Sequence, residues 1–478
     1  MVRVLFVASE GVPFVKTGGL ADVIGSLPKE LRKQGLDVRV MLPKYGDIPI
    51  HLKEKMVSIK KITIPVGWRQ QYCGIEALNQ EGVPFYFIDN EYYFKRPGLY
   101  GFYDEAERFA FFCRAVLESL PHLDFAPQII HCHDWHTGMV SVLLKAHYKN
   151  HPFYQGIRTM FTIHNLQYQG VFPRSILGDL LNLGEEYFTI DGVEFYGQVS
   201  FMKGGLNFSD LLTTVSETYA REIQDPYYGE RLDGLLRYRQ KDLHGILNGI
   251  DYELYNPAND PLICAPYDWQ SLNGKQVNKE KLQRILCLPP RQDVPVIAIV
   301  SRLVSQKGLD LVAHVLEEIL NMDVQLVVLG AGEKKYEQLF KDFALRYPDK
   351  LSTNLYFGNT LAHRIYAGAD ILLMPSRFEP CGLGQIIALR YGCLPLVRET
   401  GGLKDTILPY NRYTGAGNGF SFTNYNAHEL LFTLQRAVEL YQQPEIWFKL
   451  VVNAMQSDFS WYKSAQKYKD LYNRLNEM

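Results

Sequence analysis

The sequence predicts a doubly wound α/β fold that is built twice along the chain. Short apolar segments rich in β-branched residues alternate with segments whose apolar residues recur at helical spacing. Val2 to Ala8, Leu20 to Gln34 and Val38 to Leu42 form the first such series. Gly35 stands where the helix is expected to stop. Strand, helix and strand in this order are typical of a parallel sheet with helices on both faces.

The same pattern returns in the second half of the chain. A helix with an apolar stripe from Leu309 to Leu320 follows the strongest apolar strand, Val294 to Val300. Further strands are predicted at 128–132, 159–164, 324–329 and 371–374. The polar, proline-containing segment 256–261 lacks periodicity and predicts a crossing between two lobes. Trp461 to Leu475 predicts a terminal helix whose apolar face docks on the protein.

Composition narrows the class of protein. The chain has 478 residues, with 50 Lys and Arg against 52 Asp and Glu, which argues against a nucleic-acid binder. Its seven cysteines are odd in number and never form a CxxC, as expected in a reducing compartment. No apolar run approaches the ~20 residues of a membrane helix. We therefore expect a cytoplasmic enzyme without a membrane or nucleic-acid partner.

One short motif occurs once in each half of the chain. Thr17 to Asp22 reads TGGLAD, and Thr400 to Asp405 reads TGGLKD. In both, small residues precede a predicted helix and leave backbone N–H groups available to an anion. Lys16 adds a positive charge before the first copy. The glycines alone also fit simple tight turns, but two copies favour a ligand with phosphate or sugar hydroxyl groups.

Two further polar segments follow predicted strands of the second half. Arg302 and Lys307 come after the strand ending at Val300, where open α/β sheets bind ligands, and both can hold phosphate. Glu379 precedes Pro380, and proline suits a loop or the first turn of a helix. The carboxylate of Glu379 could bind sugar hydroxyls there. A solvated basic loop and a simple Glu-Pro turn are the alternative interpretations of these segments.

The densest polar cluster is the run His131 to His136, which reads HCHDWH. Histidines two apart share one face of a strand, as metal ligands often do. His164 and Asn165 form the only comparable later strand end, and the second half has few histidines. We therefore favour hydrogen bonds from these side chains to sugar hydroxyls, or burial in the core, over a catalytic metal.

Together these motifs resemble the bacterial glycogen synthase and plant starch synthase family over nearly the whole chain. The matching segments are 16–23, 133–136, 164–165, 248–251, Arg302 with Lys307, 378–383 and 400–403. The resemblance implies a GT-B glycosyltransferase with two Rossmann-like domains facing across a deep cleft. It implies retaining transfer of glucose from ADP-glucose to the non-reducing end of an α-1,4-glucan, with no metal and no other cofactor.

The resemblance also implies roles for individual residues. Lys16, Gly18 and Gly19 would contact the donor phosphates and glucose. Arg302 and Lys307 would neutralise the diphosphate, Glu379 would bind glucose hydroxyls, and His164 would lie near the anomeric carbon. The remaining implied substrate-binding positions are Asp22, Asp134, Asn165, Asn248, Cys381, Gly382, Leu383, Thr400 and Gly401. Since Glu379 binds hydroxyls in this scheme, we expect front-face substitution without a covalent glucosyl-enzyme.

The expected domains are an acceptor-side domain at 1–250, a nucleotide-sugar domain at 251–455, and a helix at 456–478 that docks on the first domain. Three other functions stay open at this point. They are a UDP-glucose-dependent GT-B transferase such as a sucrose synthase-like enzyme, a non-catalytic glucan-binding protein, and a metal hydrolase. Phe357 lies where an aromatic ring could stack on adenine, or it could belong to the core.

Overall fold

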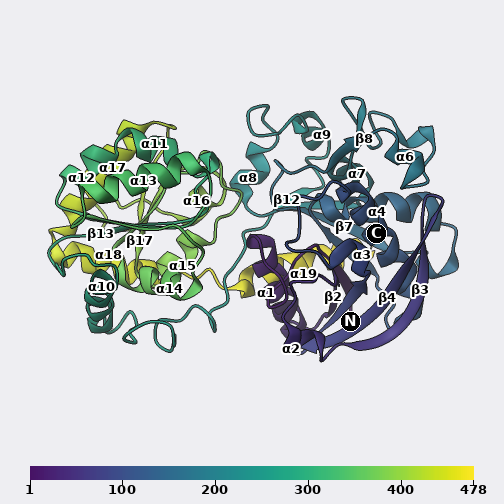
Figure 1. The fold of residues 1–478 in the computed structure, drawn as a ribbon, viewed down its shortest axis with the longest axis horizontal. Coiled ribbons are helices and arrows are strands. Elements are labelled where there is room, and N and C mark those ends of the chain that lie inside the picture. Colours follow the sequence, from purple (N-terminus) through teal and green to yellow (C-terminus); the bar gives the residue numbers. More distant parts are fainter. Residues whose placement is uncertain (478) are drawn as a thin grey trace. The chain divides into compact units, whose positions relative to one another are not determined.

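The computed structural model describes residues 1–477 and divides into two compact units (Figure 1). Unit 1 comprises Met1–Asn248 and the chain from Trp461 onward. Unit 2 comprises Gly249–Ser460. Both units are mixed α/β structures, in agreement with the fold class that the alternating apolar pattern predicts.

The main sheet of unit 1 is parallel except at one edge. Its strands are β1 (Arg3–Val7), β2 (Asp37–Pro43), β3 (Val57–Val66), β4 (Arg69–Gln80), β5 (Val83–Asp89), β6 (Ile129–His133), β7 (Arg158–Ile163), β11 (Leu211–Thr214) and β12 (Leu243–Gly245). They lie in the order β12-β11-β7-β6-β1-β2-β5-β4-β3, with β3 and β4 antiparallel to their neighbours. The chain between β7 and β11 forms a separate small sheet, which consists of β8 (Val171–Pro173), β9 (Glu194–Phe195) and β10 (Gln198–Ser200).

The helices of unit 1 include the terminal helix of the chain. They are α1 (Gly19–Lys33), α2 (Ile50–Lys53), α3 (Glu91–Phe94), α4 (Glu105–Ser119), α5 (Gly138–Leu143), α6 (Ile176–Asp179), α7 (Phe201–Phe208), α8 (Glu217–Glu222), α9 (Asp233–Tyr238) and α19 (Trp461–Glu477). Helix α1 ends before Gly35, whose φ of 90° suits glycine best. Helix α19 packs against α1, and Lys469 Nζ donates to the carbonyl oxygen of Gln34 over 2.8 Å.

Unit 2 is built on one parallel sheet. Its strands are β13 (Val296–Val300), β14 (Gln325–Leu329), β15 (Leu351–Asn354), β16 (Ile371–Met374), β17 (Leu394–Arg398) and β18 (Phe420–Phe422). Their spatial order, β15-β14-β13-β16-β17-β18, is the 3-2-1-4-5-6 order of the Rossmann fold. The central strands β13 and β16 read as continuous apolar runs because helices cover both faces of the sheet.

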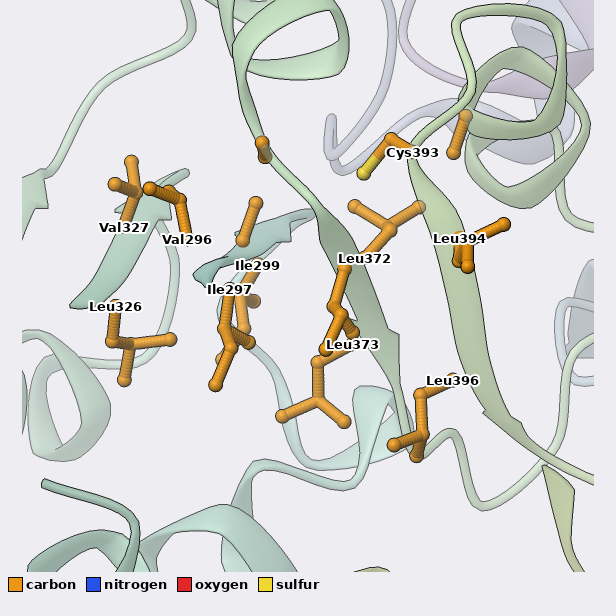
Figure 2. Close-up of a cluster of buried hydrophobic side chains, with 14 of the residues drawn as sticks. Val296, Ile297, Ile299, Leu326, Val327, Leu372, Leu373, Cys393, Leu394 and Leu396 are labelled. Atoms are coloured by element: carbon orange, nitrogen blue, oxygen red, sulfur yellow. The ribbon is translucent and has the colours of Figure 1, made fainter. Parts of the chain in front are cut away.

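Helices on the two sides of this sheet enclose the core of unit 2. They are α10 (Asn273–Ile285), α11 (Leu309–His314), α12 (Leu316–Asn321), α13 (Lys334–Arg346), α14 (Asn359–Gly368), α15 (Gly384–Arg390), α16 (Gly401–Thr406), α17 (Ala427–Tyr441) and α18 (Pro444–Gln456). In Figure 1, α11, α13 and α17 lie on one side of the sheet, and α10, α14, α15 and α18 lie on the other. Figure 2 shows the buried side chains of four neighbouring strands, among them Ile297, Leu326, Leu372 and Leu394.

Two details differ from the sequence-based expectation. The segment 256–261, predicted as a crossing between lobes, lies inside unit 2, because buried Asp260 accepts hydrogen bonds from His363 Nδ1 over 2.7 Å and Tyr391 OH over 2.6 Å. The predicted helix along Leu309 to Leu320 is divided into α11 and α12 by Val315, whose φ of −118° is not helical. The apolar stripe continues across this break, so periodicity alone gives no sign of it.

Candidate functional site

A charged pair of unit 2 lies where its sheet reverses strand order, between β13 and β16. Lys307 follows β13, and Glu379 follows β16. Lys307 Nζ lies 2.6 Å from Glu379 Oε2, and Ser376 Oγ donates to the same oxygen over 3.0 Å. The side chains of Lys307 and Glu379 are only 16% and 8% exposed. Parallel sheets bind ligands at such reversals, so the pair stands where a phosphate or sugar would be held.

The two loops that carry this ion pair are joined to each other. The backbone N–H of Arg377 donates to the carbonyl oxygen of Gln306 over 2.9 Å, and Gln306 Nε2 donates to the carbonyl oxygen of Phe378 over 3.4 Å. Arg302 opens the first loop, and its side chain is exposed. Within residues 1–477 no carboxylate forms an ion pair with Arg302, which leaves its guanidinium available to an anion.

The second TGGL motif packs backbone to backbone against the Glu379 loop. A Cβ atom on Gly401 would lie 1.9 Å from the carbonyl oxygen of Glu379, and one on Gly402 would lie 2.1 Å from that of Cys381. Gly401 also has a φ of 43°. The N–H of Gly402 donates to the carbonyl oxygen of Glu379 over 3.1 Å. Glycine is therefore required here for close approach, and the motif positions the loop that holds Glu379.

The predicted positions after Glu379 belong to the same assembly. Gln385 Nε2 donates to the carbonyl oxygens of Cys381 and Gly382, both over 3.0 Å. Leu383 and Thr400 are the residues directly before α15 and α16. The structure thus brings the predicted positions 379, 381–383 and 400–401 together in unit 2. The second TGGL motif contacts Glu379 directly, and Gln385, which sequence analysis did not single out, holds 381 and 382.

In unit 1, a buried glutamate organises the loop after β1. The Thr17 backbone N–H and hydroxyl both donate to Glu10 Oε2, the hydroxyl over 2.9 Å. Burial raises the pKa of Glu10, while hydrogen bonds from Thr17 and Gly18 lower it. Helix α1 begins at Gly19, so Glu10 fixes the backbone that leads into the helix N-terminus.

Lys16 and Asp22 form an ion pair beside this helix start. Lys16 Nζ lies 2.7 Å from Asp22 Oδ1. Burial raises the pKa of Asp22, and the nearby Lys16 lowers it. The Lys16 side chain is 47% exposed, so its ammonium group remains accessible to an anion while the carboxylate keeps it over the first turn of α1.

The loops after β6 and β7 meet at Asp134. Asp134 Oδ1 accepts the backbone N–H of His164 over 2.7 Å and that of Asn165 over 3.4 Å. Burial raises the pKa of Asp134 to about 7 against the effect of these two bonds. Burial lowers the pKa of His164 to about 3, so its imidazole is neutral. Asp134 has a φ of 58°, which turns the chain sharply at the strand end.

Three histidines of this region, His131, His133 and His164, bond to protein groups. His131 accepts or donates at both ring nitrogens, 2.7 Å from Tyr472 OH and 2.6 Å from Thr162 Oγ1. His133 Nδ1 lies 2.9 Å from His164 Nε2, and the rings of His131 and His133 are 4.1 Å apart. Nowhere in residues 1–477 do three His, Cys, Asp or Glu side chains gather as metal ligands would. Both ring nitrogens of His131 are thus used in hydrogen bonds to side chains of α19 and β7.

Unit 1 has a cavity of about 610 Å³, and several of its lining residues follow these loops closely in the sequence. Its lining combines aromatic rings with amide and charged groups: Phe102, Tyr103, Glu105, Trp135, Gln167, Tyr168, Gln169, Gly170, Val171, Phe172, Phe195, Glu230 and Arg231. Aromatic faces with a few polar groups suit a ligand that has both apolar ring faces and hydroxyls. A sugar chain has this character.

Two other predicted positions have informative surroundings. Asn248 is the last residue of the first segment of unit 1, and its buried Oδ1 has no hydrogen-bond partner in residues 1–477. A ligand hydroxyl would satisfy this oxygen. Phe357 is 73% exposed, so the alternative that places it in the core is wrong.

The structure adds residues that sequence analysis missed. Glu10, Ser376 and Gln385 hold the predicted site loops in place, and His133 contacts His164. His133 belongs to the histidine run that the sequence shows, and Glu10 left a weaker signal, because a glutamate two residues after a predicted buried strand is unusual in a core position. The others depend on contacts between segments far apart in the chain.

We expect the neutral, half-buried His164 to make the protein sensitive to acid. An unfolded imidazole binds a proton near pH 6.5, whereas folded His164 does so only near pH 3. The free energy of unfolding should therefore fall with decreasing pH across this window, by about 1.4 kcal/mol per pH unit from this group alone. Urea titrations from pH 7 to pH 4 should show a shallower fall for His164→Asn. Equal slopes for the two proteins would contradict this account.

Comparisons with known proteins identify the family of the chain. The family model for the starch synthase catalytic domain matches residues 3–238, and that for glycosyl transferases group 1 matches residues 288–449. The chain is 68% identical over 474 residues to a glycogen synthase of Desulforamulus reducens, covering 99% of both chains. It is 60% identical to a glycogen synthase of Anoxybacillus flavithermus, covering 99% of this chain and 98% of that one.

Solved structures give the same picture. The catalytic domain of starch synthase IV from Arabidopsis thaliana, solved with ADP and acarbose, aligns with a TM-score of 0.94 at 34% identity and full coverage of both chains. Sucrose-phosphate synthase from Thermosynechococcus elongatus aligns with a TM-score of 0.63 at 16% identity over 99% of both chains, which shows a shared fold. Two Rossmann-like units with polar groups at their strand ends define a glycosyltransferase of the GT-B fold. Within this class, the chain belongs to the glycogen synthase family.

Proposed function

We propose that this enzyme transfers glucose from ADP-glucose to the non-reducing end of an α-1,4-glucan, with retention of the anomeric configuration. Family membership supports a nucleotide-sugar donor and a glucan acceptor. The ADP found in the Arabidopsis relative supports adenine over uracil in the donor. The observation that carries the proposal is the buried Lys307–Glu379 pair at the strand-order reversal of unit 2.

In this proposal unit 2 holds the leaving group. Breaking the anomeric C–O bond transfers negative charge to the diphosphate, and Lys307 with Arg302 stabilises that charge. Such cations accelerate the reaction because they stabilise the transition state, in which the diphosphate gains negative charge, more strongly than the ground state. Glu379, oriented by Lys307 and Ser376, accepts hydrogen bonds from glucose hydroxyls. The backbone at 381–383 and 400–401 completes the proposed donor site of unit 2.

Unit 1 contributes the groups that contact glucose and the acceptor. Lys16 and the N–H groups at Gly18 and Gly19 bind donor oxygens, supported by the fixation of this loop by Glu10. His164 lies near the anomeric carbon in the proposal, and Asp134 holds the backbone of His164. Asp22, Asn165 and Asn248 are assigned to the glucose and acceptor hydroxyls.

We favour front-face substitution, in which the leaving phosphate oxygen receives the acceptor proton. A double displacement would need a carboxylate nucleophile at the anomeric carbon. The ion pair with Lys307 and the bond from Ser376 occupy Glu379 Oε2, which supports an orienting role for this carboxylate. Trapping of a covalent glucosyl–Glu379 adduct would contradict the proposed mechanism. Since Lys307 and Arg302 supply positive charge to the diphosphate, the proposal includes no metal ion.

A donor panel tests the proposal. Purified enzyme is given glycogen and either ADP-[14C]glucose or UDP-[14C]glucose, and label in precipitated glycogen is counted. We expect transfer mainly from ADP-glucose, with Glu379→Gln reducing it strongly. Preference for UDP-glucose would support the sucrose synthase-like alternative, and absence of transfer from both donors would support a glucan-binding protein.

The aromatic cavity of unit 1 is our candidate for the bound acceptor chain. Tyr168 lines it and is 50% exposed, so its ring can pack on a glucose face. We expect Tyr168→Ala to raise KM for maltohexaose about tenfold, which corresponds to roughly 1.4 kcal/mol of lost stacking. KM for ADP-glucose should change little. Tyr238→Ala, a more exposed tyrosine of unit 1 outside the cavity, is the control. Equal effects of both substitutions would contradict the assignment.

We propose a cytoplasmic location for the enzyme. None of the helices in residues 1–477 is both long and apolar enough to cross a membrane. No two cysteines in this part of the chain form a disulfide. Reduced cysteines support a cytoplasmic location, where glucan would accumulate.

A further inference from the structure

The two ring nitrogens of His133 differ in their hydrogen bonding. His133 Nδ1 lies 2.9 Å from His164 Nε2. The other nitrogen of His133, Nε2, is buried and has no hydrogen-bond partner in residues 1–477. The rings of Phe6 and His131 pack against His133 at centroid distances of 5.1 and 4.1 Å. His133 therefore makes its one hydrogen bond to His164.

This asymmetry decides which nitrogen holds the shared proton. Both rings are neutral, because burial lowers the pKa of each and no carboxylate bonds to either ring among the described residues. If His164 Nε2 carried the proton, His133 Nδ1 would accept it and His133 Nε2 would carry a buried N–H without an acceptor. Buried orphan N–H groups are rarer than buried orphan acceptors. The proton therefore resides on His133 Nδ1, and only a lone pair is left unpaired at Nε2.

We propose that His133 is a positioning residue that holds His164 in the Nδ1–H tautomer, so that His164 serves the reaction as a hydrogen-bond donor. The hydrogen bond from His133 occupies the lone pair of His164 Nε2. His164 Nδ1 bonds to no other group of residues 1–477 and is the nitrogen left for substrate. This inference rests on the proposed function only in placing His164 at the reacting sugar.

The tautomer restricts the path of the acceptor proton. A neutral histidine with hydrogen on Nδ1 and an occupied Nε2 has no lone pair with which to remove that proton. The acceptor oxygen forms its bond to the anomeric carbon as the bond to the diphosphate oxygen breaks. The acceptor proton then passes to that phosphate oxygen, while His164 donates a hydrogen bond and stays neutral throughout.

A nitrogen spectrum tests the tautomer without measuring activity. Long-range ¹H–¹⁵N correlation spectra of protein labelled in its histidine rings distinguish the two neutral tautomers. The 12 histidines can be assigned by comparing spectra of single variants such as His164→Asn and His133→Asn. At pH 7.5 we expect His133 and His164 both as Nδ1–H. A wild-type spectrum with His164 as Nε2–H would overturn the inference.

Variants at His133 test the consequence for catalysis. His133→Phe keeps an aromatic ring but removes the donor, so His164 should become a mixture of tautomers and kcat should fall about tenfold, with KM for the donor unchanged. His133→Asn places an amide N–H near the position of Nδ1 and should keep kcat within about threefold of wild type. Unchanged kcat and tautomer in His133→Phe would overturn the inference.

A control on the same strand separates this effect from packing. His131→Phe changes the neighbouring ring, which bonds to Tyr472 and Thr162 and makes no hydrogen bond to His164. We expect it to leave the His164 tautomer unchanged. If His133→Phe does not fold, the wild-type spectrum still decides. If wild-type enzyme transfers no glucose, the proposed function fails, whereas the spectrum continues to test the tautomer.

Discussion

Replacement of Lys307 by methionine is expected to lower kcat for glucose transfer by about 10²- to 10³-fold, the cost of losing one preorganised charge at a transition state. Lys307 Nζ lies 2.6 Å from Glu379 Oε2 at the end of β13, and both side chains are largely buried. Removing the cation also leaves a buried carboxylate without its partner, at a cost of about 3 kcal/mol of folding free energy. Initial rates with ADP-glucose and urea unfolding measure the two effects.

A double variant separates stability from catalysis. Lys307→Met combined with Glu379→Gln removes both charges, so stability should recover while transfer stays low. Lys341→Met, which changes an exposed lysine on α13 of the same unit, is the matched control and should retain full activity. Wild-type kcat in Lys307→Met would remove the main support for the proposed leaving-group site.

Gly401→Ala is expected to lower kcat about 10²-fold through a single added methyl group, the size of effect that a small misplacement of reacting groups can produce. The new Cβ would lie 1.9 Å from the carbonyl oxygen of Glu379, so the loop must move. The φ of 43° at this position adds strain for alanine. Steady-state kinetics should show a lower kcat, and thermal unfolding should show a lower Tm.

Gly384→Ala provides the comparison for this substitution. Its Cβ would have Met374 Sδ and Tyr366 OH as nearest neighbours at 3.5 Å, an ordinary contact distance, at the start of helix α15. We expect activity and Tm close to wild type. If Gly401→Ala behaved like Gly384→Ala, the second TGGL motif would not position Glu379 in the way we infer.

Much of the fold could be predicted from the sequence, because its determinants are local. The apolar strand runs near Val4 and Ile297 and the helical stripe from Trp461 to Leu475 correspond to β1, β13 and α19. The break at Val315 could not be predicted, since the apolar spacing continues through it. The packing of 256–261 inside unit 2 also lay beyond prediction, because it depends on Asp260 finding partners about a hundred residues away.

The candidate site likewise has parts that could be predicted from the sequence and parts that depend on contacts in three dimensions. Lys307 and Glu379 could be proposed as separate motifs because each follows a strand that the apolar pattern predicts. That they form one buried ion pair follows from the strand order, in which β13 and β16 are neighbours. Gln385 and His133 act through contacts between loops, and a single sequence gives no measure of such distances. The unpaired nitrogen of His133 is likewise visible only in three dimensions.

The most direct test of the central claim is calorimetric binding of ADP to wild type, Lys307→Met and His164→Asn. If unit 2 holds the diphosphate and His164 serves the sugar, Lys307→Met should weaken ADP binding at least tenfold, or about 1.4 kcal/mol. His164→Asn should bind ADP as wild type does while transferring glucose poorly. Unchanged ADP affinity in Lys307→Met, together with lost affinity in His164→Asn, would contradict the account.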